Sequence, residues 1–520
     1  MKSKKPPHPK KVKRPVNQNI WHEHPLRILR YSFRSLWLLI FPLLRGISVL
    51  RLNELEIDRE SLYLWLRGAW QDILILGAII IFGLIRWNCT RVELSGGSVI
   101  YREGVLVRLR TSIPLESISV ITAENPLYLM PVRGVRLSID TRAGIFKTTD
   151  LKLLMKRKYS DEMLSRLPDI DIRRSTGDIS DPSGLSVLLF SLFFSSGFSG
   201  TVYIATFFFK GGDIAHDIIT LYLSRITETT ERLTSNFILK IPGAALAAGT
   251  FFISAWLLSF FVNIQRYSRF RISSDDRYLR VTCGLFNRRS YRISLGHINY
   301  TDLRQNLIMK LAGVVSVSIS CAGYGTSSQH LPVLMPMKLE KNLGKGLERL
   351  GVFSGVKLNF RPVRTALYSY IYIPVYAALA LLPASDKLAQ FFPQFAELIR
   401  FAGIMLEIPA VWMVAVRTAA LYTSGISLYS DKILISCSKW NTFHTIAADR
   451  ESIVKLEISQ SLYQKYISHR CSLIFWFCGE GSSRYCINSM RLRDAVEISS
   501  VLGFGNAAVR KVPKKRRKAE

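Results

Sequence analysis

Few residues in this 520-residue chain have the types and spacing that chemistry requires. Cys471, Cys478 and Cys486 are seven and eight residues apart, unlike the close cysteine pairs of structural zinc sites, and their surroundings predict strands. The segment His22–His24 could ligate a metal, but no partner cluster accompanies it, and a solvated segment is the preferred interpretation. No phosphate-binding loop, nucleophile elbow or zinc-protease motif is present. We therefore expect no enzymatic activity, no catalytic residue, no metal site and no cofactor.

Arginines are the main candidates for binding. Two groups each follow a glycine by four to eight residues, and guanidinium forks match the geometry of phosphate oxygens. The alternative is a solvated strand face with ordinary surface charge. The tentative anion-binding residues are Arg108 and Arg110 after Gly104, and Arg288, Arg289 and Arg292 after Gly284.

The two glycines open two copies of one module, which must position these arginines. In residues Gly104–Gly144 and Gly284–Gly323, apolar residues, a Pro or Ser, and glycines recur at the same spacing. From its second glycine onward, the second copy is one residue shorter than the first. A third, degenerate copy includes Ile453. It has Ser438 and Lys439 where the first glycine would be, and His469 where the second would be. It also lacks the arginine group.

Each module is expected to consist of antiparallel strands closed by a helix. Short alternating segments bounded by Gly, Pro, Asn and Ser predict about seven strands per copy. A stretch with apolar residues at helical spacing follows each copy and predicts the closing helix. These stretches are Leu151–Leu167, Leu339–Leu350 and Ala495–Leu502. Such a plan is that of a pleckstrin-homology-like (PH-like) small β-barrel.

The first module resembles a known family. The residues that carry the resemblance are Arg91–Leu94, Gly104, Ile113, Pro114, Ile118, Leu127, Gly134 and Val135. The chain resembles the bacterial PH-like domain proteins of the YdbT type. The resemblance implies PH-like domains in several copies, each directly after a pair of transmembrane helices. PH-like domains can bind anionic head groups through basic residues, so it also implies a possible role for the arginines.

Six apolar segments in three pairs precede the modules. A bilayer-spanning helix needs about 20 mostly apolar residues. The segments are Ser35–Leu52, Ala69–Trp87, Leu185–Phe209, Phe237–Ile264, Leu367–Pro383 and Phe395–Val416. Buried helices of a soluble protein are the alternative. The expected fold class is membrane α+β: six transmembrane helices in three hairpin pairs, each followed by a cytosolic PH-like barrel with a C-terminal helix.

Charge predicts the orientation. The net charge is +32, and the short loops within the helix pairs are poor in Lys and Arg. The positive-inside rule then places both termini and all three modules in the cytoplasm of a bacterial cell, with the chain multi-pass in the inner membrane. All seven cysteines fall on this side or at its membrane edge, which implies a reducing compartment.

The predicted domain boundaries follow from these features. They are a basic disordered arm (1–34), transmembrane pair 1 (35–87), module 1 (88–168), a linker (169–184), transmembrane pair 2 (185–264), module 2 (265–351), a linker (352–366), transmembrane pair 3 (367–417), a degenerate module 3 (418–504) and a basic tail (505–520). The arm is too lysine-dense for an ordinary secretory signal, so no cleaved signal peptide is expected.

Two further features lie outside the modules. The C-terminal tail carries a run of basic residues: Lys514, Lys515, Arg516, Arg517 and Lys518. Beside an anionic leaflet, each would contribute on the order of 1 kcal/mol of binding free energy. Nucleic acid is the less favoured alternative for them. Glu407 falls near the middle of the sixth apolar segment, where a carboxylate should be buried, protonated or paired, either in a proton or ion path or in helix packing.

The sequence as a whole predicts a non-enzymatic polytopic membrane protein. Its three cytosolic PH-like modules would act as a lipid- or protein-binding scaffold at the membrane face. The expected partners are membrane lipids, including anionic head groups, and a protein partner. A small-solute or lipid transporter that uses a six-helix core is the alternative, with Glu407 as its pointer.

Overall fold

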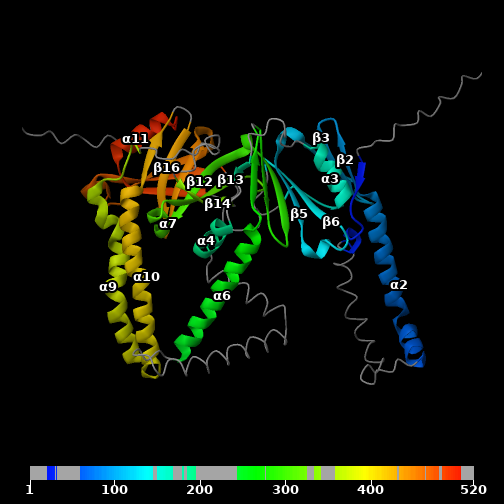
Figure 1. Ribbon diagram of the computed structural model, residues 1–520, viewed down its shortest axis with the longest axis horizontal. Helices are drawn as coiled ribbons and strands as arrows, with labels where there is room; N and C mark the ends of the chain where they lie inside the picture. The colour runs from blue at the N-terminus through cyan, green and yellow to red at the C-terminus, as the bar shows by residue number, and fades with distance from the viewer. Residues whose placement is uncertain are drawn as a thin grey trace, which may run out of the picture. The chain divides into compact units, whose positions relative to one another are not determined.

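A computed structural model shows how the strands and helices of the chain are arranged (Figure 1). The structure describes residues 20–29, 31, 59–143, 149–167, 178–180, 184–194, 243–275, 277–324, 333–340, 358–429, 432–462, 464–478 and 483–504. The chain divides into two compact units, residues 1–142 with 149–169 and residues 143–148 with 170–520. Each unit is described by itself. Module 1 lies in the first unit, and modules 2 and 3 lie in the second.

Module 1 is an antiparallel β structure that follows a long helix, α2 (Arg59–Cys89). Its first sheet has the order β1-β2-β3-β4, with β1 (Ile20–His22), β2 (Arg91–Ser95), β3 (Ser98–Glu103) and β4 (Leu109–Pro114). The second group of strands pairs in the order β5-β6-β7, with β5 (Ile118–Asn125), β6 (Gly134–Thr141) and β7 (Leu151–Lys156). Helix α3 (Arg157–Arg166) closes the module, and its Met163 is fully buried in the core between the strands.

Module 2 repeats this plan after helix α6 (Gly243–Tyr267). Its first strands are β8 (Asp178–Ser180), β9 (Arg271–Ser274), β10 (Tyr278–Cys283) and β11 (Arg288–Ser294), paired in that order. Its second group is β12 (Ile298–Asn306), β13 (Val314–Cys321) and β14 (Val333–Leu339), with the short helix α7 (Leu307–Leu311) between β12 and β13. Helix α4 (Gly184–Phe194) packs beside β14 through Phe190.

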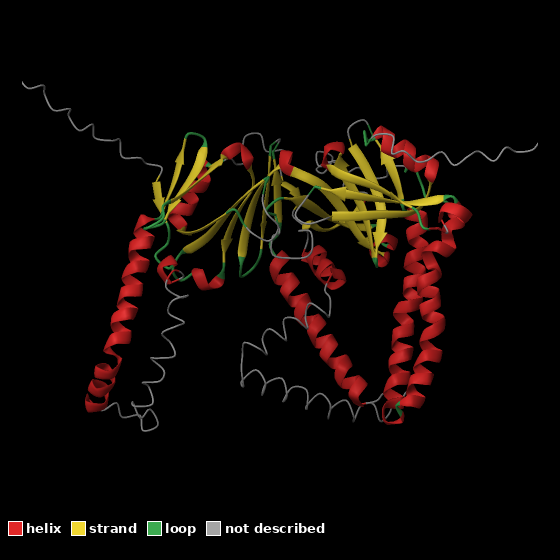
Figure 2. Ribbon diagram, turned by 180° about the vertical axis from the view of Figure 1, so that it is seen from behind, coloured by secondary structure: helices red, strands yellow, loops and turns green. Residues whose placement is uncertain are grey.

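Module 3 follows the hairpin of helices α9 (Leu367–Phe391) and α10 (Ala396–Thr423), which lie side by side in Figures 1 and 2. Its first strands are β15 (Gly425–Leu428), β16 (Lys432–Lys439) and β17 (Thr442–Asp449). Its second sheet is β18 (Ile453–Ser459), β19 (Arg470–Phe477) and β20 (Ser483–Arg491), closed by α11 (Leu492–Val501). The predicted third copy therefore has two groups of strands and a closing helix, although its glycines are absent.

Ile118, Ile298 and Ile453 occupy equivalent positions in the three modules. Each is the first residue of a strand, and each follows a three-residue 3-10 turn. Each strand then has a register shift directly after that isoleucine. Ile118 and Ile453 are buried, and Ile298 is half-buried.

A left-handed backbone position accounts for the one-residue slip between copies. The residue before the second strand of this sheet has positive φ in every module: 51° at Arg133, 64° at Gly313 and 51° at His469. Gly313 therefore corresponds to Arg133, not to Gly134. Because only glycine adopts this conformation without strain, the glycine of module 2 is the relaxed solution and the other two modules tolerate a modest cost.

One predicted helix segment is wrong. Residues Leu151–Lys156 form strand β7, and the closing helix begins only at Arg157. The apolar residues Leu151, Leu153 and Met155 alternate with exposed or half-buried neighbours, which is the pattern of a strand. The prediction of a closing helix in module 3 is confirmed by α11.

The expected core of six transmembrane helices is wrong. In the described part of the chain, two helices are long and apolar enough to span a membrane, Arg364–Phe391 and Pro393–Thr423. Within the described residues, the apolar part of α2 is Leu74–Cys89, which is shorter than the roughly 20 residues required. Helix α4 has only 11 residues. The predicted segment 35–52 and most of 195–242 lie outside the described residues.

Helices α9 and α10 approach closely at a small residue. A Cβ atom built on Gly403 would lie 2.5 Å from Ser385 Oγ, so only glycine fits there without a shift. Small residues permit such close contact between apolar helices, where no hydrophobic effect drives association in lipid. Near the turn between the helices, Arg400 Nε lies 3.3 Å from Asp386 Oδ1.

Modules 2 and 3 share one continuous sheet. Strand β12 of module 2 pairs along its length with β17 of module 3, from Tyr300 opposite Ala448 to Asn306 opposite Thr442. Tyr300 also belongs to the core of module 3, and its hydroxyl donates to Ser483 Oγ at 2.7 Å. Residues from both modules thus build one core, so neither module is complete without the other.

A buried ionic cluster lies at this shared sheet. The side chain of Asp302 is fully buried, and its Oδ2 accepts from Arg304 Nε at 2.9 Å and from His444 Nδ1 at 3.0 Å. Burial alone would raise the pKa of Asp302, but the attraction of His444 and Arg304 outweighs it, so the pKa lies below its usual range. Arg304 and His444 are directly opposite across the β12–β17 pair. The cluster therefore joins the two modules through charge as well as backbone.

We expect Asp302→Ala to destabilise the second unit by roughly 3–5 kcal/mol, because it leaves a buried arginine without its counter-ion. The exposed Asp449 gives a matched control, and Asp449→Ala should change stability by less than about 0.5 kcal/mol. Thermal unfolding of the full chain in detergent measures both. Equal shifts for the two variants would contradict the prediction.

The same cluster predicts sensitivity to acid. Since the folded-state pKa of Asp302 is depressed, its stabilisation is fully present above the unfolded value of about 3.9 and is lost as pH falls through the lower folded value. In the wild-type chain, the unfolding temperature of this unit should therefore fall below about pH 4. The Asp302→Ala variant should lose less stability over that range.

Candidate functional site

Every module begins within a few residues of a helix end. Helix α2 ends at Cys89 and β2 begins at Arg91, and α10 ends at Thr423 with β15 beginning at Gly425. The single residues between them, Thr90 and Ser424, are buried.

The hydroxyls of Thr90 and Ser424 both donate to a backbone carbonyl of the preceding helix. Thr90 Oγ1 donates to the carbonyl of Arg86 at 2.9 Å, and Ser424 Oγ donates to the carbonyl of Ala420 at 2.6 Å. In module 2, the backbone N–H of Ser268 donates to Ile264 at 2.8 Å. These bonds supply donors to carbonyls near the C-terminal ends of the helices.

In each module, the loop that joins the last two strands of the first group returns toward the helix. We call this loop the hairpin tip; it is the β3–β4 loop in module 1, the β10–β11 loop in module 2 and the β16–β17 loop in module 3. In modules 1 and 2 this tip is a five-residue loop, since Glu103 pairs with Leu109 and Cys283 pairs with Arg289. The loop opens with a glycine, Gly104 at φ 106° or Gly284 at φ 100°. A Cβ atom on Gly104 would lie 1.9 Å from the Val107 carbonyl oxygen, and one on Gly284 would lie 2.1 Å from that of Asn287. The repeated glycines are therefore required by the shape of the tip.

The tip of module 2 is bonded to the end of its helix. The N–H of Gly284 donates to the carbonyl of Ser268 at 2.8 Å, and the N–H of Leu285 donates to Gln265 in the last turn of α6 at 3.0 Å. The tip thus supplies donors to carbonyls at the C-terminal end of the helix.

Module 3 has a shorter tip, which contacts α10 at Trp412, several turns before the helix ends at Thr423. Lys439 pairs with Thr442, so only Trp440 and Asn441 form the turn, and Trp440 takes the positive φ of 53°. Asn441 Oδ1 accepts from Trp412 Nε1 of α10 at 3.1 Å. Because the loop is three residues shorter, the glycine of the other copies has no counterpart.

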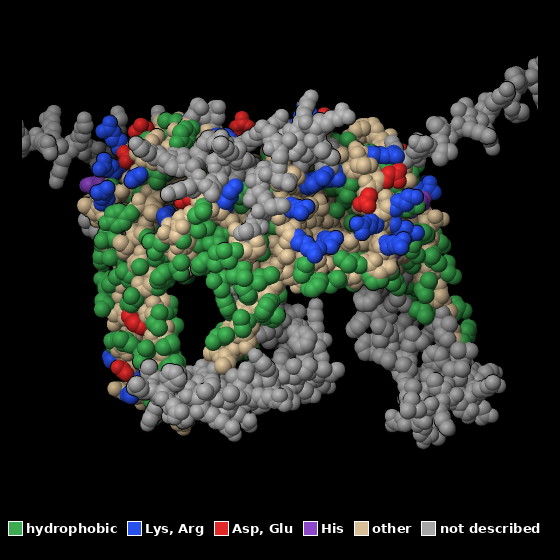
Figure 3. Space-filling model, viewed as in Figure 1, with side chains coloured by type: hydrophobic (Ala, Val, Ile, Leu, Met, Phe, Trp, Pro, Cys, Tyr) green, Lys and Arg blue, Asp and Glu red, His purple; other side chains and the backbone are tan. Residues whose placement is uncertain are grey.

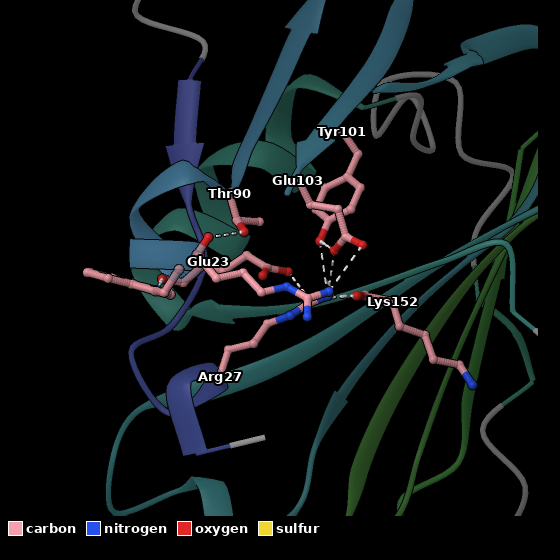
Figure 4. Close-up of polar contacts among 8 residues, drawn as sticks. Glu23, Arg27, Thr90, Tyr101, Glu103 and Lys152 are labelled. Carbon is pink, nitrogen blue, oxygen red and sulfur yellow. Dashed lines mark hydrogen bonds and ion pairs between the residues drawn. The ribbon is translucent and has the colours of Figure 1, made fainter. Parts of the chain in front are cut away.

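Module 1 is held to its helix by a buried polar cluster, shown in Figure 4. Arg27 pairs with Glu23, and its guanidinium donates to the carbonyl of Lys152 and to the hydroxyl of Tyr101, each at 3.0 Å. The same guanidinium lies 3.7 Å from Glu103 Oε2, which accepts from Tyr101 at 2.7 Å. This cluster links the segment that contains Glu23 and Arg27 to strands β3 and β7.

The cluster also contacts the end of α2. Trp87 Nε1 donates to the carbonyl of Glu23 at 2.9 Å, and Arg86 Nη2 lies 3.8 Å from Glu103 Oε1. Burial raises the pKa of Tyr101 and opposes the charge on Arg27, but Glu23 raises the pKa of Arg27 above its usual value. Arg27 therefore remains a cation that fixes the base of the β3–β4 tip.

The tips expose apolar side chains beside basic ones. Leu106 is 90% exposed, Val107 is 81% exposed and Trp440 is 75% exposed, which is unusual for such large apolar residues. Leu285 and Phe286 of module 2 are exposed as well. Figure 3 shows hydrophobic side chains over the surfaces of α6, α9 and α10, whereas Lys and Arg side chains gather over the strands. The tips therefore lie where an apolar helix surface meets a basic one.

The structure places the predicted arginines on or next to these tips. Arg108 ends the β3–β4 loop, Arg110 lies in β4, and both are exposed. Arg288 is exposed at the start of β11, whereas Arg289 and Arg292 are half-buried and interact with other groups. Their role in binding stays a prediction. The exposed apolar residues at the tips were missed, although the Leu-Val pair soon after Gly104 was visible in the sequence.

The remaining candidates lie elsewhere. Glu407 is in α10, two residues before Pro409, and its Oε2 is buried with no hydrogen-bond partner in the described residues. Both ring nitrogens of His24 have partners, because Nε2 lies 3.1 Å from the Val132 carbonyl oxygen and Nδ1 accepts from Leu26. Within the described ranges, no group of His, Cys, Asp and Glu side chains could hold a metal. The tail residues Lys514–Lys518 lie outside the described part.

The tip geometry predicts a specific sensitivity to substitution. Gly284→Ala places a Cβ against the Asn287 carbonyl at positive φ, so we expect it to destabilise the second unit by about 1–3 kcal/mol. Gly296 has open space and no positive φ, and Gly296→Ala should change stability by less than about 0.5 kcal/mol. Unfolding temperatures of the two full-length variants test this, and a neutral Gly284→Ala would show that the tip geometry is wrong.

Known proteins share parts of this architecture. A family model described as "Bacterial PH domain" matches residues 62–167 and 233–365, which include modules 1 and 2. The UPF0699 transmembrane protein YdbT of Bacillus subtilis (strain 168) is 30% identical over 132 residues, 25% of this chain and 27% of the relative. That alignment spans little more than a quarter of the relative's length. No solved structure matches the chain. These matches confirm the resemblance drawn from the sequence: the two matched regions are similar to the bacterial PH domain, and the chain is similar to a YdbT-type membrane protein.

Proposed function

We propose that this chain is a non-enzymatic membrane protein whose three PH-like modules form a binding scaffold at the cytoplasmic face of the bacterial inner membrane. Helices α9 and α10 would anchor it in the bilayer, and both termini would lie in the cytoplasm. The modules would contact lipid directly through their hairpin tips and present their remaining surface to anionic lipid or a protein partner.

One observation supports this proposal above the others: the first-sheet tips of all three modules lie beside the C-terminal parts of the helices that lead into them. In modules 1 and 3, the tips expose Leu106, Val107 and Trp440 almost fully. Aromatic and apolar side chains flanked by cations are favoured at the boundary between hydrocarbon and head groups. A tip at that depth would bury its apolar residues in lipid and leave its basic residues among phosphates.

Aromatic side chains on the α9–α10 hairpin support a membrane surface at the same depth as the tips. Tyr368, Tyr372 and Tyr376 are exposed along the first turns of α9, and the hydroxyls of Tyr368 and Tyr376 are 3.0 Å apart. Trp412, which contacts the tip of module 3, is also exposed, on α10. Such aromatic side chains are enriched at membrane interfaces. They lie on the part of the hairpin next to the module.

Trp440 offers a direct test of tip insertion. In proteoliposomes that contain brominated phospholipids, contact with lipid should quench Trp440, so Trp440→Phe should reduce the quenchable share of the tryptophan fluorescence. Trp21 is buried in module 1, and Trp21→Phe should leave that share unchanged. If Trp440→Phe also leaves it unchanged, the tip does not reach lipid and the proposal fails.

The orientation is tested by reporter fusions to the full chain. A periplasm-active reporter inserted at Phe392, in the turn between α9 and α10, should be active, and one placed after Phe504 should be inactive. A cytoplasm-active reporter should show the reverse. Activity of the periplasmic reporter after Phe504 would place the modules on the opposite side and overturn the cytoplasmic assignment.

A further inference from the structure

Three arginines form a row across the first sheet of module 1. The antiparallel register places Arg91 of β2 opposite Arg102 of β3, and Arg102 opposite Arg110 of β4. His22 of β1 lies opposite Arg91 at the end of the same row. The neighbouring positions, Val92 and Tyr101, point into the core, so the arginines project from the outer face.

The row concentrates positive charge with little neutralisation. All three arginines are exposed, and among the described residues the one ion pair found for them joins Arg102 Nη2 to Glu93 Oε2 at 3.0 Å. Like charges directly opposite on adjacent strands destabilise a sheet. A merely solvated face would be more stable with mixed charges, so this arrangement favours a site that binds an anion.

The position of the row points to the source of that anion. Arg91 is two residues beyond the end of α2, so the row lies at the helix end of the sheet. One register step beyond Arg102 and Arg110 is the β3–β4 tip with its exposed Leu106 and Val107. An apolar tip directly beside a cationic row matches a lipid, which offers hydrocarbon next to phosphate.

The chemistry of the row suits phosphate in particular. Adjacent strands are about 4.8 Å apart, so the three arginine stems span about 10 Å and their long side chains can converge on one phosphate group. Guanidinium groups donate paired hydrogen bonds to phosphate oxygens, whereas a choline head group would bring an additional positive charge to the row.

We propose that Arg91, Arg102 and Arg110 form a site for the phosphate of an anionic phospholipid head group, with Leu106 and Val107 in the adjoining acyl region. This site rests on the proposed function, because it requires the tip of module 1 to meet the membrane. Module 2 has only a pair of arginines opposite each other, Arg280 and Arg292, and module 3 has no such row. The strongest preference for anionic lipid therefore belongs to module 1.

The test uses the full-length protein in a neutral detergent. Its affinity is measured for dihexanoyl phosphatidylglycerol, dihexanoyl phosphatidylcholine and inorganic phosphate. We expect phosphatidylglycerol to bind at least about tenfold more tightly than either other probe, because only it combines a net negative phosphate with acyl chains. Equal affinity for phosphatidylglycerol and inorganic phosphate would overturn the assignment to lipid in favour of a free phosphate.

Two triple variants separate the row from net charge. The row variant carries Arg91→Gln, Arg102→Gln and Arg110→Gln, and the control carries Lys156→Gln, Arg157→Gln and Lys158→Gln, three exposed cations at the start of α3. The row variant should lose the preference for phosphatidylglycerol, and the control should keep it. If both variants lose it equally, the binding depends on net charge and the site is refuted.

Folding and insertion are checked in the same proteins. Without lipid, the row variant should unfold at the same or a higher temperature than the wild type, because repulsion has been removed, but phosphatidylglycerol should no longer raise that temperature. Quenching of Trp440 by brominated lipid should persist in the row variant. A wild type with quenched Trp440 but no preference for phosphatidylglycerol refutes the row alone, whereas an unquenched wild type refutes the proposed function.

Discussion

The short connection between each helix and the strand that follows it constrains the rest of the structure. A single residue separates α2 from β2 and α10 from β15, and the hydroxyl of that residue bonds back into the last helical turn. The first strand therefore has no freedom to move away from its helix. Because β2 pairs with β3 and β3 with β4, the tip between β3 and β4 must return to the helix end. The position of the candidate site follows from this connection.

Two different loops satisfy that constraint. Modules 1 and 2 use five residues and a glycine with φ near 100°, whereas module 3 uses a two-residue turn with Trp440 in the left-handed region. The short turn brings a large indole to the place where the longer loops carry Leu106 or Phe286. The third copy thus differs in sequence at the tip but keeps an apolar residue there. This agreement between unlike loops favours a shared contact with an apolar phase over accidental exposure.

The sequence revealed the repeat because local backbone geometry fixes Gly104, Gly284 and the isoleucine that opens each second group of strands. Features that depend on strand register were not visible. Arg91 and Arg102 are eleven residues apart in the chain, and only pairing shows that they are opposite each other. The six-helix prediction rested on apolar content alone, whereas in the described part of the chain two helices, Arg364–Phe391 and Pro393–Thr423, are both long and apolar enough to span a membrane. The segment 151–156 was assigned to a helix although its alternation is that of a strand.

The shared sheet of modules 2 and 3 also bears on how a scaffold could work. The β10–β11 tip is bonded to the end of α6, and the β16–β17 tip contacts α10, so each helix is tied to its own module. Pairing of β12 with β17 and the buried Asp302 cluster then tie the two modules to each other. Rotating one module against the other would break a strand pair and expose a buried carboxylate, which is costly. The second unit therefore holds α6 and α10 in a fixed relation and presents two tips together, which suits a surface that binds as one body.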